Sequence, residues 1–193
     1  MSELFSIQLQ NRQQQGMDGV WLDLPTTTEQ VQAALRQIGI SSDNPQGLFI
    51  SGYFAEEEKR FAIPYNMVLA SNVDELNFLA SRLETLSTGE RAELNAALQA
   101  PQSELFSIGR ITDFPENVDY YVHLPDVHGP AQLGDYYLNR SGMVDMPEEW
   151  KGGIDTAQFG RYVAQQEQGG LTEDGFIVDG RDAWLPGQAG QQL

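Results

Sequence analysis

The sequence of 193 residues contains no cysteine, only two histidines, and only two lysines, Lys59 and Lys151. The absence of cysteine excludes disulfides, thiolate zinc sites and cysteine nucleophiles. No apolar run approaches the roughly 18 residues that span a membrane. The start of the sequence has no basic segment followed by an apolar one, so we expect no signal peptide and a cytoplasmic location.

Basic residues are scarce as a class, since 28 Asp and Glu face 11 Lys and Arg, a net charge of −17. Such a charge repels nucleic acid and anionic membranes, which proteins bind through Lys and Arg. We therefore expect neither as a partner, and expect attraction to cationic surfaces such as those that hold DNA or RNA. Acidity that serves only solubility, or a salty habitat, is the alternative. Hydrophobic residues make up 40% of the chain, which is enough for a packed core.

The order of patterns predicts an α+β fold of three small domains. Residues 1–60 alternate like strands around one helix, 61–112 have helical periodicity, 113–185 combine strands and helices with many acids, and 186–193 form a loose tail. In the first domain we expect strands within 3–9, 17–25 and 47–54 and a helix within 26–40.

Capping signals define the helices of the central region. Asn72 is a suitable N-cap for a helix over 72–86, and Ser87 with Glu90 forms a capping box for a helix over 87–101. In the last third we expect a strand over 118–124, helices within 130–142 and 155–170, and a closing strand over 174–180.

The candidates for catalytic chemistry are His123, Asp126 and His128. Their spacing fits neither a helical i,i+4 pair nor a strand i,i+2 pair of metal ligands. The chain has no G-x-S-x-G elbow, P-loop or G-x-G-x-x-G fingerprint. We therefore expect no enzyme activity, no metal and no cofactor. A metal-dependent hydrolase built on these three residues remains an alternative hypothesis.

The acids of the last third are dispersed among aromatic and aliphatic residues, not gathered in a run. Dispersed acids on an ordered scaffold predict a fixed pattern of negative charge, whereas a block of like charge is typical of a disordered tail. The candidate residues of this acidic surface are Asp113, Glu116, Asp119, Asp126, Asp135, Asp145, Glu148, Glu149, Asp155, Glu167, Glu173 and Asp174.

Several segments resemble one known family. "GVWLDLP" and the ordered combination "LGDYYLNRSG", "MPEEW" and "FGRY" carry the resemblance, which extends from about residue 17 to 178. The chain resembles ArdA antirestriction proteins of plasmids and conjugative transposons. The resemblance implies an elongated homodimer of three-domain α/β chains that mimics bent B-form DNA. It also implies that the protein occupies the DNA-binding groove of Type I restriction–modification enzymes, on the methyltransferase core, and so protects incoming mobile DNA.

The resemblance also implies a dimer contact in the last domain, which here would involve Leu133, Tyr136, Tyr137 and Leu138. These apolar residues could instead form the core of their own domain. One departure is "FISGYF", where Ser51 and Gly52 stand in place of the family's His and Asp. A decoy for a different basic, DNA-binding partner is the other function that the charge pattern leaves open.

Overall fold

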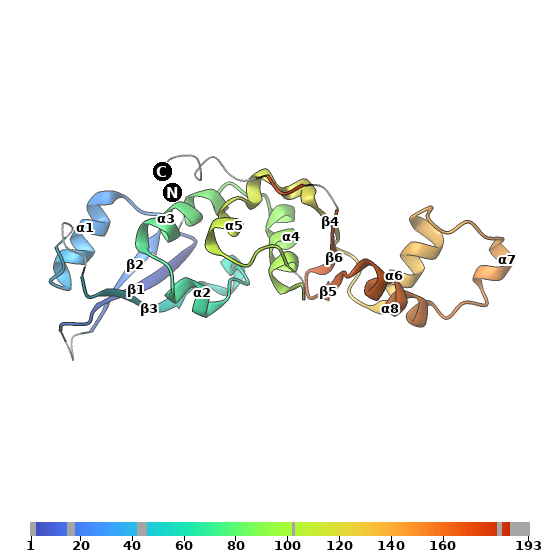
Figure 1. Cartoon of the computed structure of the whole chain (residues 1–193), viewed down its shortest axis with the longest axis horizontal. Coiled ribbons are helices and arrows are strands. Elements are labelled where there is room, and N and C mark those ends of the chain that lie inside the picture. Colours follow the sequence, from blue (N-terminus) through green and yellow to red (C-terminus); the bar gives the residue numbers. More distant parts are fainter. Residues whose placement is uncertain (1–2, 15–17, 42–45, 102, 181–182, 186–193) are drawn as a thin grey trace. The chain divides into compact units, whose positions relative to one another are not determined.

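The computed structural model describes residues 3–14, 18–41, 46–101, 103–180 and 183–185 (Figure 1). The predicted tail, 186–193, lies outside the described residues. Contacts divide the chain into two compact units. Unit 1 is formed by Met1–Leu86 and Phe106–Pro115, and unit 2 by Ser87–Leu105 and Glu116–Pro186. The fold is mixed α and β, as the sequence predicts. The three-domain division stays a prediction; its boundary at residue 61 lies within unit 1.

Unit 1 contains a three-stranded antiparallel sheet of β1 (Phe5–Asn11), β2 (Val20–Leu24) and β3 (Leu48–Phe54) in the order β2-β1-β3. Alternating residues of each strand point to one face, and this face buries Ile7, Leu9, Leu22, Leu24 and Ile50. The three strands agree with the alternation read in the sequence.

The helices of unit 1 are α1 (Thr28–Gln37), α2 (Tyr65–Leu69), α3 (Val73–Leu83) and α5 (Ile108–Thr112), and α5 packs on α3. Two 3₁₀ turns are η1 (Glu57–Lys59) and η2 (Phe114–Glu116). Helices α1 and α3 contact β2, and α2 contacts β3. Asn72 caps α3 by accepting a hydrogen bond from the backbone N–H of Glu75, as predicted. The capping box of α1 pairs Thr27 with Gln30.

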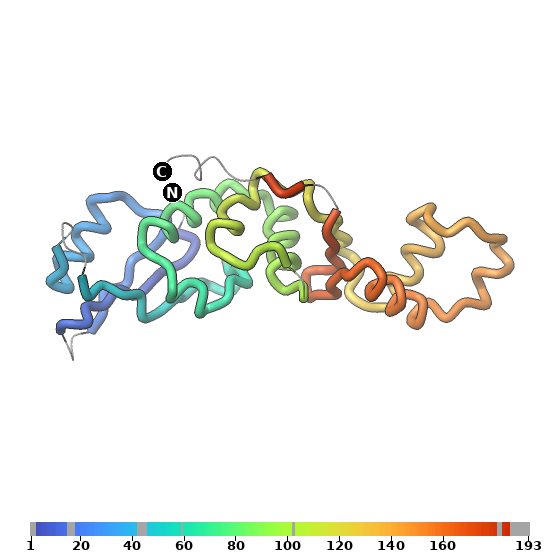
Figure 2. Tube along the Cα trace, in the orientation of Figure 1, coloured from blue at the N-terminus to red at the C-terminus, as the bar shows by residue number. Residues whose placement is uncertain are grey.

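Unit 2 has its own sheet, in the order β4-β6-β5, from β4 (Tyr121–Leu124), β5 (Gly170–Thr172) and β6 (Gly175–Asp179). Figure 2 shows how β6, near the red end of the chain, returns to lie beside β4. Helix α4 (Thr88–Gln99) packs on this sheet and begins with the predicted capping box of Ser87 and Glu90. The strand predicted over 118–124 starts as a 3₁₀ turn, η3 (Val118–Tyr120), and only then becomes β4.

The remaining helices of unit 2 are α6 (Pro130–Asp135), α7 (Glu148–Lys151) and α8 (Thr156–Glu167). A π-helical segment, η4 (Tyr136–Arg140), continues α6, and the N–H of Ser141 donates to the carbonyl of Tyr136. The sequence predicts one regular helix here. The π turn inserts one residue relative to α-helical spacing, and Leu133 and Leu138, five residues apart, are both buried.

Candidate acidic interaction surface

All twelve predicted surface acids lie in described segments, and none of them is buried. Eight are exposed: Glu116, Asp119, Asp126, Asp145, Glu148, Glu149, Asp155 and Glu173. Four are half-buried: Asp113, Asp135, Glu167 and Asp174. Asp113 belongs to unit 1 and the other eleven to unit 2. Unit 2 therefore presents these carboxylates from an ordered scaffold, on short helices, near helix ends and in the turns between helices or strands.

Basic residues neutralise only a part of this surface. Arg140 pairs with Asp135 at 2.9 Å, and Lys151 pairs with Glu148 at 2.6 Å. Two further acids have structural roles: Asp155 caps α8 through the N–H of Gln158, and Asp174 accepts a hydrogen bond from Gln99. Within the described part of the chain, Asp126, Asp145, Glu149 and Glu173 have no ion-pair partner. Their charge is free to act on a partner.

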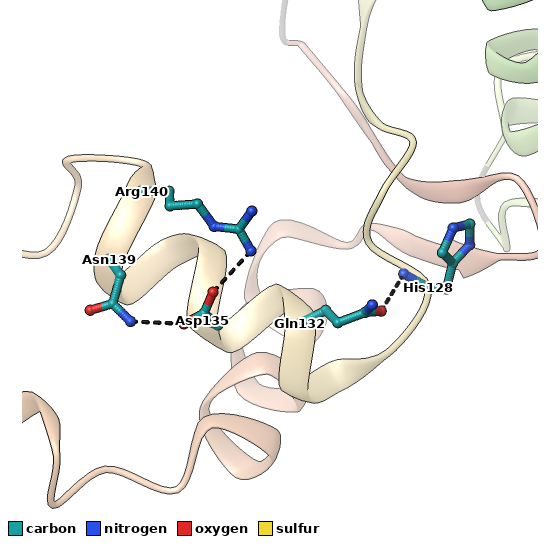
Figure 3. A network of polar contacts seen from close by, with 5 residues as sticks. All are labelled: His128, Gln132, Asp135, Asn139 and Arg140. Atoms are coloured by element: carbon teal, nitrogen blue, oxygen red, sulfur yellow. Dashed lines mark hydrogen bonds and ion pairs between the residues drawn. The ribbon is translucent and has the colours of Figure 1, made fainter.

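Within this set, the Asp135 carboxylate accepts hydrogen bonds from two side chains (Figure 3). It accepts hydrogen bonds from the Asn139 amide and the Arg140 guanidinium, both at 2.9 Å. These two bonds, the Asn139 bond first, lower the pKa of Asp135 below its usual range. In the same view Gln132 accepts a hydrogen bond from the backbone N–H of His128 at the start of α6. The turn of α6 into η4 is thus fixed by polar contacts on its exposed side.

The segment that carries Asp145, Glu148 and Glu149 connects α6 and its extension η4 to α8. The packing of α6 on α8 therefore fixes the two ends of this segment. The two helices pack through a pair of glycines. A Cβ at Gly134 would overlap the carbonyl oxygen of Thr156, and a Cβ at Gly160 would overlap that of Pro130. Beside this crossing lies a core of Val127, Leu133, Val163 and Phe176.

The residues predicted for a dimer contact divide into two kinds. Leu133 and Leu138 are buried in the single chain, with 0% and 3% of their surface exposed. Tyr136 and Tyr137 are half-buried, pack edge to face on each other at 5.6 Å, and border the core of unit 2. The two leucines therefore contribute to the intradomain core, and only the tyrosines offer surface to a second chain.

The histidines are not brought together with Asp126. His123 on β4 has its Nε2 2.8 Å from the carbonyl oxygen of Asp174, whereas His128 is exposed at the start of α6. Among the described residues, no group of three or more His, Asp or Glu side chains is arranged to hold a metal ion. The geometry required by the hydrolase alternative is therefore missing from the described residues.

The sequence does not single out one acid of unit 2, Glu93, because a glutamate on a helix is usually exposed to solvent. Glu93 lies on α4 next to buried Leu94, and its Oε1 is buried without a hydrogen-bond partner among the described residues. Burial, and then the negative charges of Glu90 and Asp119, raise the pKa of Glu93 to about 7. Only the fold reveals this, since Asp119 comes from η3.

We expect Glu93→Gln to stabilise unit 2 at pH 8 by about 1–2 kcal/mol. This is less than the pKa shift alone would imply, because solvent screens the exposed part of the side chain. The folded-state pKa lies above the unfolded value of about 4.3. Glu93 therefore contributes a fall in the wild-type free energy of unfolding as pH rises from about 4.3 to 7, because this group ionises first in the unfolded state. The variant should lack this fall. Urea unfolding at pH 4, 6 and 8 measures it.

Glu149→Gln, an exposed acid, is the control and should leave that pH profile unchanged. Equal profiles for wild type and Glu93→Gln would show that Glu93 is ionised and solvated in the folded protein.

The described part of the chain has no helix of the length and apolarity needed to cross a bilayer. The class of protein is therefore a mixed α+β protein with a set of exposed carboxylates on ordered elements. The family model described as "Antirestriction protein (ArdA)" matches residues 15–178. The chain therefore belongs to the ArdA antirestriction family. Among individually curated proteins, none matches this sequence.

Both departures in "FISGYF" have structural roles. Ser51 is the additional residue where the β1–β3 register shifts, and its hydroxyl donates to Gln8 Oε1 at 3.0 Å. Gly52 is covered by the ring of Trp21 from β2, since a Cβ there would lie 3.0 Å from Trp21 Cη2. A carboxylate at position 52 would displace that ring.

Proposed function

We propose that this antirestriction protein is a DNA mimic that occupies the DNA-binding groove of a Type I restriction–modification enzyme, on its methyltransferase core. The observation that carries the proposal is the set of eleven acids of unit 2, none buried, on an ordered scaffold. The ArdA family match supports the class of target. The protein acts in the cytoplasm, without catalysis, cofactor, nucleic acid or membrane, and protects incoming mobile DNA.

Electrostatics explains how such a surface competes with DNA. Phosphates recur about every 3.4 Å per strand along the duplex axis, and a basic groove releases counterions when it binds them. Helix neighbours at i,i+3 and i,i+4 stand about 5–6 Å apart, so carboxylates on helices and their flanking turns can recur at intervals of the same order. A rigid pattern loses less conformational entropy on binding than a disordered acidic tail would.

Competition for the enzyme tests the proposal directly. We expect the protein to displace a labelled duplex from a Type I methyltransferase core, with an apparent affinity that falls steeply between 50 and about 200 mM salt. Fluorescence anisotropy of the duplex measures displacement. If a large excess of protein at low salt left the duplex bound, this target would be excluded.

The second candidate is a decoy for a different basic partner, which the dispersed carboxylates support equally well. The same anisotropy assay with a nucleoid protein and a non-restriction DNA-binding enzyme separates the two. Displacement from all of them at similar protein concentrations would favour the general decoy.

A homodimer completes the proposal, with the exposed parts of Tyr136 and Tyr137 at or near the contact. Because Leu133 and Leu138 are buried within the single chain, we propose that the tyrosines alone among these four residues make the direct contact. Sedimentation velocity of the wild type and of Tyr136→Ala/Tyr137→Ala tests it, and an unchanged dimer in the variant would place the contact elsewhere.

A further inference from the structure

The sheet of unit 1 has a face opposite the helices that remains exposed. Paired residues of neighbouring strands share a face. The register therefore places two rows on this face: Asp23, Ser6 and Phe54 in one, and Trp21, Gln8 and Gly52 in the other. We call it the open face, and its residues are Ser6, Gln8, Trp21, Asp23, Gly52 and Phe54. Two large aromatic side chains are exposed on it, Trp21 at 50% and Phe54 at 59%. Exposed aromatic side chains that gather on one face, unlike those scattered singly, mark a candidate interaction surface.

The position of Trp21 is held by the strands beneath it. Trp21 on β2 pairs with Gln8 on β1, which pairs with Gly52 on β3. Because Gly52 has no side chain, the indole ring reaches across β1 and covers it. Ser51 in turn holds the Gln8 amide. One side of the ring therefore rests on the sheet, and the ring keeps half of its surface exposed.

Beside the ring is an opening of about 410 Å³, lined by Glu3, Trp21, Leu22, Asp23, Pro25, Thr26 and Gln30. Its lining contains two exposed carboxylates and no basic residue. Asp23 is oriented by the Ser6 hydroxyl, which donates to Oδ1 at 2.6 Å. A smaller opening of about 80 Å³ continues past Glu3 to Phe54 and Glu56. The larger opening is near the lower end of ligand-site volumes and suits one extended side chain.

From this geometry we infer that the open face binds an arginine side chain that projects from a basic protein partner, with the guanidinium stacked on Trp21 and bonded to Asp23. The indole is the aromatic ring that attracts cations most strongly. Asp23 lines the same opening as Trp21 and supplies acceptors for the N–H groups of a stacked guanidinium. Charge complementarity therefore selects the occupant: the lining is anionic and aromatic, and the groove of a DNA-binding enzyme is rich in arginine.

Arginine fits this arrangement better than lysine does. A planar guanidinium stacks on a ring while its N–H groups point sideways to a carboxylate, whereas an ammonium group cannot satisfy both contacts in this way. The inference deepens the proposed function, because it assigns unit 1 a discrete contact in addition to the carboxylate pattern of unit 2. The proposed function is needed only to say which protein supplies the arginine.

The full chain, titrated with acetylated tetra-arginine amide, tests the inference without any restriction enzyme. Two-dimensional ¹H–¹⁵N spectra resolve the indole N–H groups of Trp21, Trp150 and Trp184, and Trp21→Phe assigns the first. We expect the Trp21 indole resonance to shift saturably and at lower peptide concentration than the other two. Tetra-lysine amide should bind about two- to fivefold more weakly at this position.

Matched variants separate the stacked arginine from general attraction to an acidic protein. Trp21→Ala should weaken tetra-arginine binding about two- to fivefold, whereas Phe78→Ala, an exposed aromatic on α3 outside the lining, should not. Asp23→Asn should weaken binding more than Glu149→Gln, which makes the same charge change in unit 2. Backbone resonances and melting temperatures check that each variant is folded.

Three results would overturn the inference: no shift of the Trp21 indole, equal binding of the two peptides, or equal losses for Asp23→Asn and Glu149→Gln. None of them touches the proposed function, which depends on displacement of duplex DNA. Conversely, a saturable arginine site in a protein that displaces no duplex would leave this inference in place and refute the proposed target.

Discussion

Replacement of Gly134 by alanine is expected to lower the free energy of unfolding of unit 2 by at least about 3 kcal/mol, the upper end of what overpacking costs. The reason is geometric. The new methyl group would overlap the backbone carbonyl oxygen of Thr156 in α8. A backbone atom inside a helix cannot rotate away as a side chain can, so the two helices must separate. Separation exposes Leu133 and Val163 of the core.

Urea unfolding followed by the fluorescence of Trp184 measures the loss, in a background where Trp21 and Trp150 are Phe. Trp184 reports on unit 2, because it packs on Tyr120 at 5.2 Å. The reciprocal variant, Gly160→Ala, should be similarly destabilised, since its Cβ would overlap the carbonyl of Pro130.

Gly89→Ala is the matched control, in α4 of the same unit. A Cβ at Gly89 would have no neighbouring atom within 4 Å. Alanine there should be neutral or should stabilise unit 2 by at most about 0.5 kcal/mol, because Gly89 is in the first turn and the propensity difference of about 0.5–1 kcal/mol applies to helix interiors. If Gly134→Ala were as stable as Gly89→Ala, the close contact of α6 and α8 would be wrong.

Local signals in the sequence were sufficient for most elements. Alternation located β1, β2 and β3, and short-range caps located the starts of α3 and α4, because Asn72 and Ser87 bond to backbone groups only three residues away. Each of these signals is contained in a window of a few residues. The ArdA resemblance also follows from contiguous segments, and the family match confirms it.

Features that depend on distant residues were not predictable in this way. The pairing of β4 with β6 joins residues as far apart as Tyr121 and Asp179. The close approach of Gly134 and Gly160 joins residues 26 positions apart, and the raised pKa of Glu93 depends in part on the charge of Asp119 in η3. For the candidate surface, composition and dispersal predicted the exposed acids, but the register of the π turn determined which of Leu133, Tyr136, Tyr137 and Leu138 keep any exposed surface.

Neutralising four exposed acids of unit 2 together is expected to weaken displacement of duplex DNA by at least about 30-fold, whereas each single change should cost about 0–1 kcal/mol. The four are Asp126→Asn, Asp145→Asn, Glu149→Gln and Glu173→Gln. None of them caps a helix or forms an ion pair among the described residues, so the fold should be unaffected. Losses at separate positions add, and a mimic of many phosphates has no single indispensable contact. The salt dependence of displacement should also become shallower, since fewer counterions are exchanged.

The control for this variant carries the same change of four charges in unit 1: Asp18→Asn, Glu57→Gln, Glu58→Gln and Asp74→Asn, all exposed. Net charge alone steers an acidic protein towards a basic groove, so the control should slow association slightly and alter the equilibrium much less. Equal losses in the two quadruple variants would mean that bulk charge, and not the pattern on unit 2, opposes DNA binding. A single neutralisation in unit 2 that abolished displacement would also contradict the proposal that many carboxylates share the interaction, because it would locate the interaction in one discrete contact. A graded loss confined to unit 2 is the outcome that only a phosphate-like arrangement of its carboxylates predicts.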